Sequence, residues 1–163
     1  MIVIRPATEK DLPGIQEIYN DAILHSIATF DTEAKTDEQM KVWLNQHSGQ
    51  YPAIVAVLGE EVLGWASLSR WSDRKAYDTT AEISFYVRQG HRGKGLGKQL
   101  LEVITLEGKQ VGLRCILSRI TEGNPVSVHL HEGLGYRMIG TIEDAGKKFG
   151  RYLSVQMMQI VFK

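Results

Sequence analysis

The chain has 163 residues, of which 43% are hydrophobic and 23% charged, a composition typical of one globular domain with a single core. Nineteen lysines and arginines balance nineteen aspartates and glutamates, so net charge gives no support for a nucleic-acid or anionic-membrane partner. The chain start lacks the apolar core of a signal peptide, and the single cysteine, Cys115, excludes an intramolecular disulfide. We therefore predict a cytoplasmic protein.

In the first half of the chain, the apolar pattern predicts a strand at 2–5 and two helices. Thr8 is placed to cap the first helix, with Asp11 three residues later, and an apolar stripe follows at helical spacing. Thr36 and Gln39 open the second helix in the same way. A turn at 59–61 joins predicted strands at 53–58 and 62–69 into a hairpin.

The second half of the chain begins with a strand at 81–87, in which Glu82, Ser84 and Tyr86 share one face. A helix is predicted over 96–110, and its expected core residues are Leu96, Leu100, Val103, Ile104 and Leu106. A strand at 115–120 precedes a short helix that begins at Asn124-Pro125 and ends at 133–135. The final strands are expected at 136–142 and 152–162. The mixed order of strands and helices predicts an α/β fold with much antiparallel pairing.

A glycine-rich turn links the strand at 81–87 to the helix at 96–110, and it reads Arg92-Gly93-Lys94-Gly95-Leu96-Gly97-Lys98. Alternating glycines allow close approach of a ligand, and a helix start presents unpaired N–H groups and the positive end of the peptide dipole. We predict a pyrophosphate site here. The spacing fits neither the dinucleotide fingerprint nor the nucleoside-triphosphate loop. A flexible basic turn is the structural alternative.

The pattern Arg92-x-x-Gly95-x-Gly97 after a strand resembles the acetyl-CoA motif of the GNAT superfamily of N-acetyltransferases. The resemblance extends along nearly the whole chain, to the phosphinothricin and methionine sulfoximine N-acetyltransferase branch. It is carried by Arg5-Pro6-Ala7-Thr8, Ile18-Tyr19-Asn20, Ala28-Thr29-Phe30, Tyr77-Asp78, Leu130-His131-Glu132-x-Leu134-Gly135-Tyr136 and Lys148-Phe149-Gly150-Arg151.

The resemblance implies a largely antiparallel mixed sheet, flanked by helices and splayed where acetyl-CoA binds. It implies that Phe85, Tyr86 and Val87 hold the pantetheine arm and that residues 93–98 hold the pyrophosphate. Asn124 matches a family asparagine near the pantetheine, and it is also placed to cap a helix. No metal is expected.

Glu82 is the candidate general base. An α-amine is mostly protonated near neutral pH and must lose a proton before it attacks a thioester. Burial in an apolar-rich strand would raise the pKa of Glu82 towards a useful range. In the resembled branch a glutamate at this position is the base. The structural alternatives are an exposed glutamate or a salt bridge.

His131 is the second catalytic candidate. It occupies the position at which the superfamily often has a tyrosine thought to protonate the departing thiolate, and imidazole relays protons near neutral pH. The alternative is a packed histidine. Cys115 could be an acyl-carrying nucleophile, but it lies inside a predicted strand with no histidine adjacent in sequence, so we expect a small buried core residue. Direct transfer in a ternary complex, which the resemblance implies, agrees with this expectation.

The amine acceptor is expected to be small and to carry a carboxylate. Arg74 is the candidate carboxylate ligand because its planar fork can bind both oxygens. In the resembled branch, residues matching Arg74, Tyr77 and Phe30 form the acceptor pocket. The full expected set is Phe30, Ser72, Asp73, Arg74, Tyr77, Glu82, Ile83 and Ser84.

Departures from the branch pattern leave the identity of the amine acceptor undecided. The branch often has Gly-Arg-Trp-x-Asp near its end, whereas here Gly150-Arg151 is followed by Tyr152, Leu153 and Ser154. A polyamine or peptide acetyltransferase and a non-catalytic CoA-binding module are the alternatives. Family members are commonly dimers, so we expect a homodimer.

Overall fold

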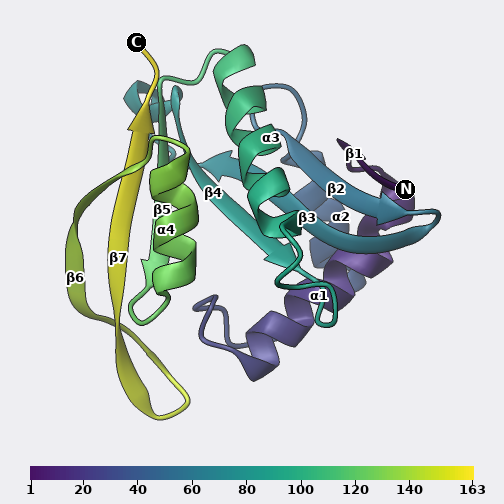
Figure 1. The fold of residues 1–163 in the computed structure, drawn as a ribbon, viewed down its shortest axis with the longest axis horizontal. Helices are drawn as coiled ribbons and strands as arrows, with labels where there is room; N and C mark the ends of the chain where they lie inside the picture. Colours follow the sequence, from purple (N-terminus) through teal and green to yellow (C-terminus); the bar gives the residue numbers. More distant parts are fainter.

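One seven-stranded sheet organises the chain, and the computed structural model describes all of residues 1–163 (Figure 1). Its strands are β1 (Ile2–Pro6), β2 (Ala53–Leu58), β3 (Glu61–Arg70), β4 (Thr80–Val87), β5 (Cys115–Thr121), β6 (Arg137–Lys148) and β7 (Arg151–Val161). Their spatial order is β1-β2-β3-β4-β5-β7-β6. Every neighbouring pair is antiparallel except β4 and β5, which are parallel. The predicted mixed and largely antiparallel sheet is confirmed.

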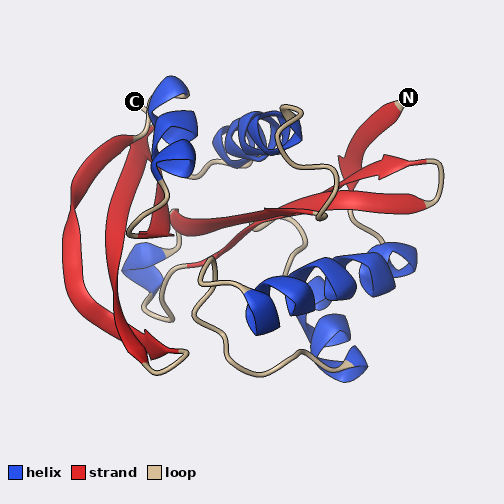
Figure 2. Cartoon of the chain, turned by 60° about the horizontal axis from the view of Figure 1, so that its bottom comes forward, coloured by secondary structure: helices blue, strands red, loops and turns tan.

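Helices cover both faces of this sheet (Figure 2). They are α1 (Leu12–His25), α2 (Asp37–Asn45), α3 (Leu96–Gln110) and α4 (Pro125–Gly133), with short 3-10 turns at Glu9–Asp11 and Lys75–Tyr77. Helices α3 and α4 lie on one face, and α1 and α2 lie on the other. No helix is both long enough and apolar enough to cross a bilayer.

The two faces bury separate apolar clusters. The larger has 17 buried residues and includes Ile83 of β4 and Leu100 of α3. The smaller has eight, among them Ile15 of α1 and Trp65 of β3. Fully burying one such large side chain stabilises a fold by roughly 1.5–3 kcal/mol. These clusters fix β4 between two helical layers, and the candidate site lies on β4.

Side-chain caps set the helix starts that the sequence predicts. The Gln39 N–H donates to Thr36 Oγ1 at 3.2 Å, and the Thr36 N–H donates to Gln39 Oε1 at 2.9 Å. The Ser127 N–H donates to Asn124 Oδ1 at 3.1 Å, with Pro125 in the first turn of α4. Each cap satisfies an N–H group that the helix itself leaves unpaired.

Two expectations about the helices and strands were wrong. Leu106 is 55% exposed, and Leu101 is fully buried in its place, so the core face of α3 is rotated from the predicted one. Strand β6 continues to Lys148, six residues beyond the predicted end at 142. Its register shifts between Ile142 and Gly146, and a strand that bulges at a sheet edge loses the alternation that sequence patterns detect.

Candidate active site

Strands β4 and β5 pair at only three positions before they separate. The partners are Thr80 with Cys115, Ala81 with Ile116, and Glu82 with Leu117. Strand β4 nevertheless continues to Val87 and stays paired with β3 along its other edge. In Figure 1 the two strands start side by side and point apart at their carboxyl ends. The sheet is therefore splayed just beyond Glu82.

The splay exposes backbone polar groups of β4. The Arg88 N–H donates to Leu63 O at 2.7 Å on the β3 side. Because backbone bonds alternate between the two edges of a strand, Tyr86 and Ser84 also bond towards β3. The parallel pairing of Glu82 with Leu117 occupies the Ile83 N–H, so the free groups at the splay are the Ile83 carbonyl and the N–H and carbonyl of Phe85. A peptide-like ligand can pair with these free groups as an added strand would.

The glycine-rich turn lies between β4 and α3. Gly93 and Gly95 have φ values of +76° and +83°, in the left-handed region that favours glycine. Gln99 is the first residue of α3 whose N–H donates to a carbonyl of the preceding turn, at Gly95 O. The N–H groups of Leu96, Gly97 and Lys98 have no backbone acceptor. This arrangement has the form of an anion site at a helix start.

Basic side chains surround this turn. Arg92 donates from Nε to Val87 O at 3.0 Å, which ties the turn to the end of β4. Lys94 is exposed, and Lys98 is paired only loosely, with Glu102 on the helix surface at 4.0 Å. An added Cβ at Gly95 would meet no atom within 4 Å, so the space above the turn is open.

Glu82 points to the α1 side of the sheet. It alternates with Ile83 and Phe85, which pack in the cluster beneath α3, and it shares its side with Tyr86. Its Oε2 lies 3.2 Å from Nε of Arg119 on β5. Burial raises the pKa of Glu82, and the charge of Arg119 opposes that rise. The Glu82 carboxylate is therefore both partly buried and ion-paired with Arg119.

His131 lies on α4 and is fully buried on the opposite side of the sheet from Glu82. Its Nδ1 lies 2.7 Å from Ser127 O, so this nitrogen carries the proton and donates it to the carbonyl. Its Nε2 is buried and has no hydrogen-bond partner. The ring packs 5.8 Å from Phe85 and 5.0 Å from Tyr136, and burial lowers its pKa. The imidazole is therefore neutral near pH 7 and shielded from solvent.

The loop between α1 and α2 covers the Glu82 side of the splay, a feature that the sequence analysis missed. Tyr86 donates to Ala28 O at 3.4 Å, and burial raises its pKa to about 12. Thr121, at the end of β5, donates to Ile27 O at 2.6 Å. Lys148 of β6 is buried and donates to Thr29 O at 2.7 Å. Three strands thereby hold this loop in place.

The predicted acceptor residues do not all gather at one place. Phe30 belongs to the loop that covers the splay, and its ring packs on Gly146 of β6, where an added Cβ would lie 2.5 Å from two ring atoms. Ser84 shares the face of Glu82. Ser72, Asp73, Arg74 and Tyr77 lie in the connection between β3 and β4, and the last three are exposed. Ile83 is buried in the cluster beneath α3, on the face of β4 opposite Glu82. Arg74 uses its backbone N–H on Ser72 Oγ at 3.3 Å, and its side chain makes no ion pair.

Cys115 is only partly buried, so the prediction that it is a buried core residue was wrong. It lies at the start of β5, and burial raises the pKa of its thiol. A raised pKa leaves the thiol protonated near neutral pH and therefore a poor nucleophile.

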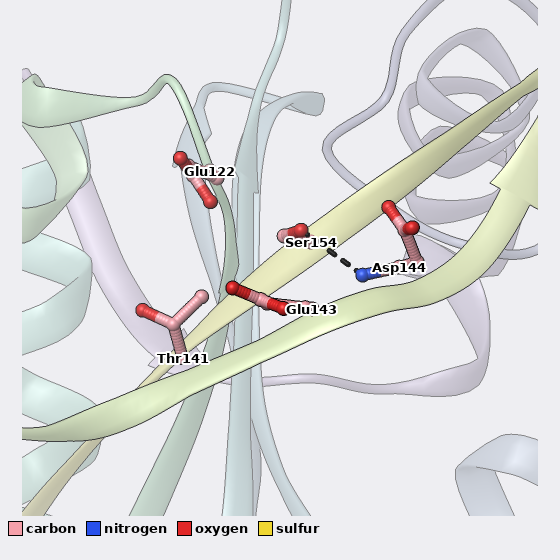
Figure 3. Close-up of a pocket in the computed structure, with 5 residues that line it drawn as sticks. All are labelled: Glu122, Thr141, Glu143, Asp144 and Ser154. Atoms are coloured by element: carbon pink, nitrogen blue, oxygen red, sulfur yellow. Dashed lines mark hydrogen bonds between the residues drawn. The ribbon is translucent and has the colours of Figure 1, made fainter.

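A separate hollow of about 490 Å³ lies where β5, β6 and β7 meet (Figure 3). Oxygen-bearing side chains line it: Glu122, Thr141, Glu143, Asp144 and Ser154. The Asp144 N–H donates to Ser154 Oγ at 3.1 Å. None of the predicted site residues lines this hollow, and no cluster of His, Cys, Asp and Glu in the chain has the arrangement of a metal site.

Comparisons with known proteins identify the class to which this splayed sheet belongs. The acetyltransferase (GNAT) domain family matches residues 4–157, and the chain belongs to that family. The structure of a GNAT superfamily phosphinothricin acetyltransferase from Sinorhizobium meliloti in complex with acetyl-CoA superposes with a TM-score of 0.93 at 32% identity, covering 98% of this chain and 88% of that one. The chain is thus an N-acetyltransferase that uses acetyl-CoA.

Curated relatives show which branch the chain resembles. It is 38% identical over 159 residues to the L-methionine sulfoximine/L-methionine sulfone acetyltransferase of Pseudomonas aeruginosa, covering 96% of this chain and 92% of the relative. It is 35% identical over 158 residues to the phosphinothricin N-acetyltransferase of Streptomyces coelicolor, covering 94% and 92%. These similarities confirm the predicted family and branch.

Proposed function

We propose that this enzyme acetylates the α-amine of small amino acids such as methionine sulfoximine, methionine sulfone and phosphinothricin, with Glu82 as the base. The observation that carries the proposal is the position of Glu82. It is the last residue of β4 paired with β5, so its carboxylate lies where the open strand edge begins. An acyl group delivered along that edge would reach a nitrogen held by Glu82.

The residues present fit acetyl-CoA. The free N–H groups of Leu96, Gly97 and Lys98 would hold the pyrophosphate, with Arg92, Lys94 and Lys98 adding positive charge. The free carbonyl of Ile83 and the free N–H and carbonyl of Phe85 would pair with the amides of the pantetheine arm. Asn124 already caps α4 with Oδ1, which leaves its amide nitrogen free for the same arm. When bound, the cosubstrate supplies the acetyl thioester.

Glu82 would then act as the general base that accepts a proton from the acceptor amine. The substrate enters as an ammonium ion, and one of its protons passes to the carboxylate. The nitrogen attacks the thioester carbon, so that a C–N bond forms and the C–S bond breaks. The nitrogen loses a second proton as the amide forms, and one proton returns to the sulfur. Overall, an ammonium ion and a thioester give an amide, a thiol and one free proton.

His131 is proposed only as a proton relay in this scheme. In the structure its Nε2 carries no proton, so it would first have to accept one before passing it to the sulfur. Replacing His131 by Gln tests this role. A relay predicts a loss in kcat with little change in acetyl-CoA affinity, whereas a purely packed ring predicts lost stability with kcat retained.

We also propose that the enzyme works in the cytoplasm as a homodimer. Strand β6 is the edge of the sheet, and it exposes Met138, Ile139 and Ile142, while Tyr152 on β7 is 64% exposed. Unprotected apolar edges of this kind are usually covered by a partner. Sedimentation at micromolar concentration tests the dimer, and a species with the monomer mass of 18.3 kDa would contradict it.

The acceptor class is tested by thiol-release kinetics with acetyl-CoA. The panel consists of methionine sulfoximine, methionine sulfone, phosphinothricin, ordinary amino acids and spermidine. The proposal predicts that kcat/KM is highest for the first three. Preference for spermidine would refute the amino-acid assignment, and thiol release with none of the amines would refute the proposed acceptors altogether.

A further inference from the structure

Arg119 is a charged residue of the candidate site that the predicted mechanism does not use. It lies on β5 two residues after Leu117, which pairs with Glu82, so Arg119 emerges on the same face of the sheet as Glu82. Its Nε lies 3.2 Å from Glu82 Oε2. Its guanidinium carbon lies 4.7 Å from the centre of the Trp71 ring. A carboxylate on one side and an aromatic face on another fix the guanidinium plane.

We propose that Arg119 is the carboxylate anchor of the acceptor amino acid and a positioning residue for Glu82. The inference rests on the proposed function and deepens it by naming the residue that selects amino acids over simple amines. The ion pair with Glu82 uses the Nε side of the guanidinium, and its terminal amino groups have no other ion-pair partner in the protein. The side chain is 52% exposed, so these donors remain accessible.

The geometry of an amino acid suits this arrangement. In an arginine the three nitrogens share one carbon and present donors in a rigid fork, which matches the two oxygens of a carboxylate. In an α-amino acid only one carbon separates the carboxylate from the amine. A carboxylate held by the outer nitrogens of Arg119 would therefore place the amine beside the carboxylate of Glu82, which the inner nitrogen holds.

Arg74, the residue predicted from the sequence, is less well placed for this task. It lies outside the sheet in the connection between β3 and β4, it is exposed, and no ion pair or aromatic contact holds its side chain. A flexible arginine must lose side-chain entropy when it binds a ligand, whereas Arg119 is already fixed between Trp71 and Glu82. Both arginines are nevertheless included in the test.

The experiment compares Arg119→Met, Arg119→Lys and Arg74→Met with the unaltered enzyme. The acceptors are methionine sulfone and its carboxamide, which keeps the amine but has no carboxylate. Arg70→Met is the matched control, because Arg70 makes a similar ion pair, with Asp78 at 3.3 Å, and also contacts an aromatic ring, that of Tyr51. The readouts are KM, kcat as a function of pH, and the calorimetric affinity of CoA-loaded protein for methionine sulfone, which needs no turnover.

We expect Arg119→Met to raise KM and Kd for methionine sulfone roughly ten- to hundredfold, the loss of a charge-assisted hydrogen bond, and to affect the carboxamide far less. Arg119→Lys should recover part of the loss. The acid limb of kcat/KM should move to higher pH in Arg119→Met, because the positive charge that lowers the pKa of Glu82 is gone.

Three results would overturn the proposal. One is an equal loss for methionine sulfone and its carboxamide. Another is a KM increase in Arg74→Met that exceeds the one in Arg119→Met. The third is an effect in Arg70→Met as large as that in Arg119→Met. If the unaltered protein binds methionine sulfone through Arg119 but does not acetylate it, the proposed function fails and the carboxylate anchor stands.

Discussion

Replacing Glu82 by Gln tests the proposed base while keeping the shape of the side chain. The amide cannot take a proton from the ammonium group, so kcat/KM should fall by at least about tenfold and by as much as 10⁴-fold, the range of general-base catalysis. Such a loss corresponds to roughly 1.4–5.5 kcal/mol of transition-state stabilisation, at about 1.36 kcal/mol for each factor of ten.

The structure predicts that this variant remains folded. Glu82 and Arg119 have side-chain exposures of 27% and 52%, and ion pairs this accessible contribute about 0–1 kcal/mol to stability. The melting temperature should therefore change by only a few degrees. Affinity for acetyl-CoA should be unchanged, because the glycine-rich turn is untouched.

Thiol-release assays over a range of pH provide the decisive comparison. Burial raises the pKa of Glu82 above its ordinary value of 4.5, so kcat/KM of the unaltered enzyme should fall as the pH drops through that raised value. This acid limb should vanish in Glu82→Gln. The control is Glu107→Gln on α3, since burial also raises the pKa of Glu107 but the residue lies outside the site. An unchanged rate and acid limb in Glu82→Gln would refute the assignment of the base.

Three further predictions follow from the same structure. Gly95→Val should weaken acetyl-CoA binding at least about tenfold by calorimetry, because the φ of Gly95 is +83° and a branched side chain would shield the free N–H groups. The control is Gly59→Val, at φ +63° in a distant hairpin, which should leave the affinity for acetyl-CoA unchanged. Asp11→Asn should lower the unfolding free energy by about 2–3 kcal/mol at pH 7. Burial opposes ionisation of Asp11, but the Arg5 guanidinium and the Thr8 N–H outweigh burial and hold the pKa of Asp11 below 3.8. In denaturant melts, the difference in unfolding free energy between Asp11→Asn and the unaltered protein should therefore shrink as the pH falls through the lowered pKa of Asp11. Gly146→Ala should raise KM for the acceptor several-fold with the affinity for acetyl-CoA retained, because the new Cβ would displace the Phe30 ring; an unchanged KM would remove Phe30 from the acceptor site.

The sequence predicted best the elements whose signals are local. Helix α3 spans Leu96–Gln110 as expected, because a glycine with positive φ begins it and an apolar period runs along it. The capping residues Thr36 and Asn124 act as predicted, since a cap depends on groups within three residues. Leu106 was misplaced because the apolar residues of this helix spread over more than one side, and periodicity alone does not fix which side faces the sheet.

The arrangement of the site depends on contacts between distant segments, which local patterns do not reveal. Glu82 and Arg119 are 37 positions apart, and they meet only because β4 and β5 pair in parallel with one particular register. That same register ends at Glu82 and so creates the splay. Likewise, the sequence indicated roles for Glu82 and His131 but not that they lie on opposite sides of the sheet.

The last part of β6 illustrates a different limit. Residues 143–148 are mostly polar and lack alternation, so they read as a loop. They form a strand because β7 offers a partner, with a bulge between Ile142 and Gly146 to absorb the mismatch. Through this strand Lys148 reaches Thr29 and steadies the loop over the splay. No helix or strand propensity predicts that contact.

Acetyl-CoA binding by this protein depends on free backbone N–H groups at the start of α3 and along the open edge of β4. The most direct measurement is a titration of the protein with acetyl-CoA followed by amide-resolved NMR. We predict the largest shifts at residues 93–98 and at Phe85, with small shifts around the hollow between β5, β6 and β7. Shifts concentrated at that hollow, with residues 93–98 unchanged, would contradict the account.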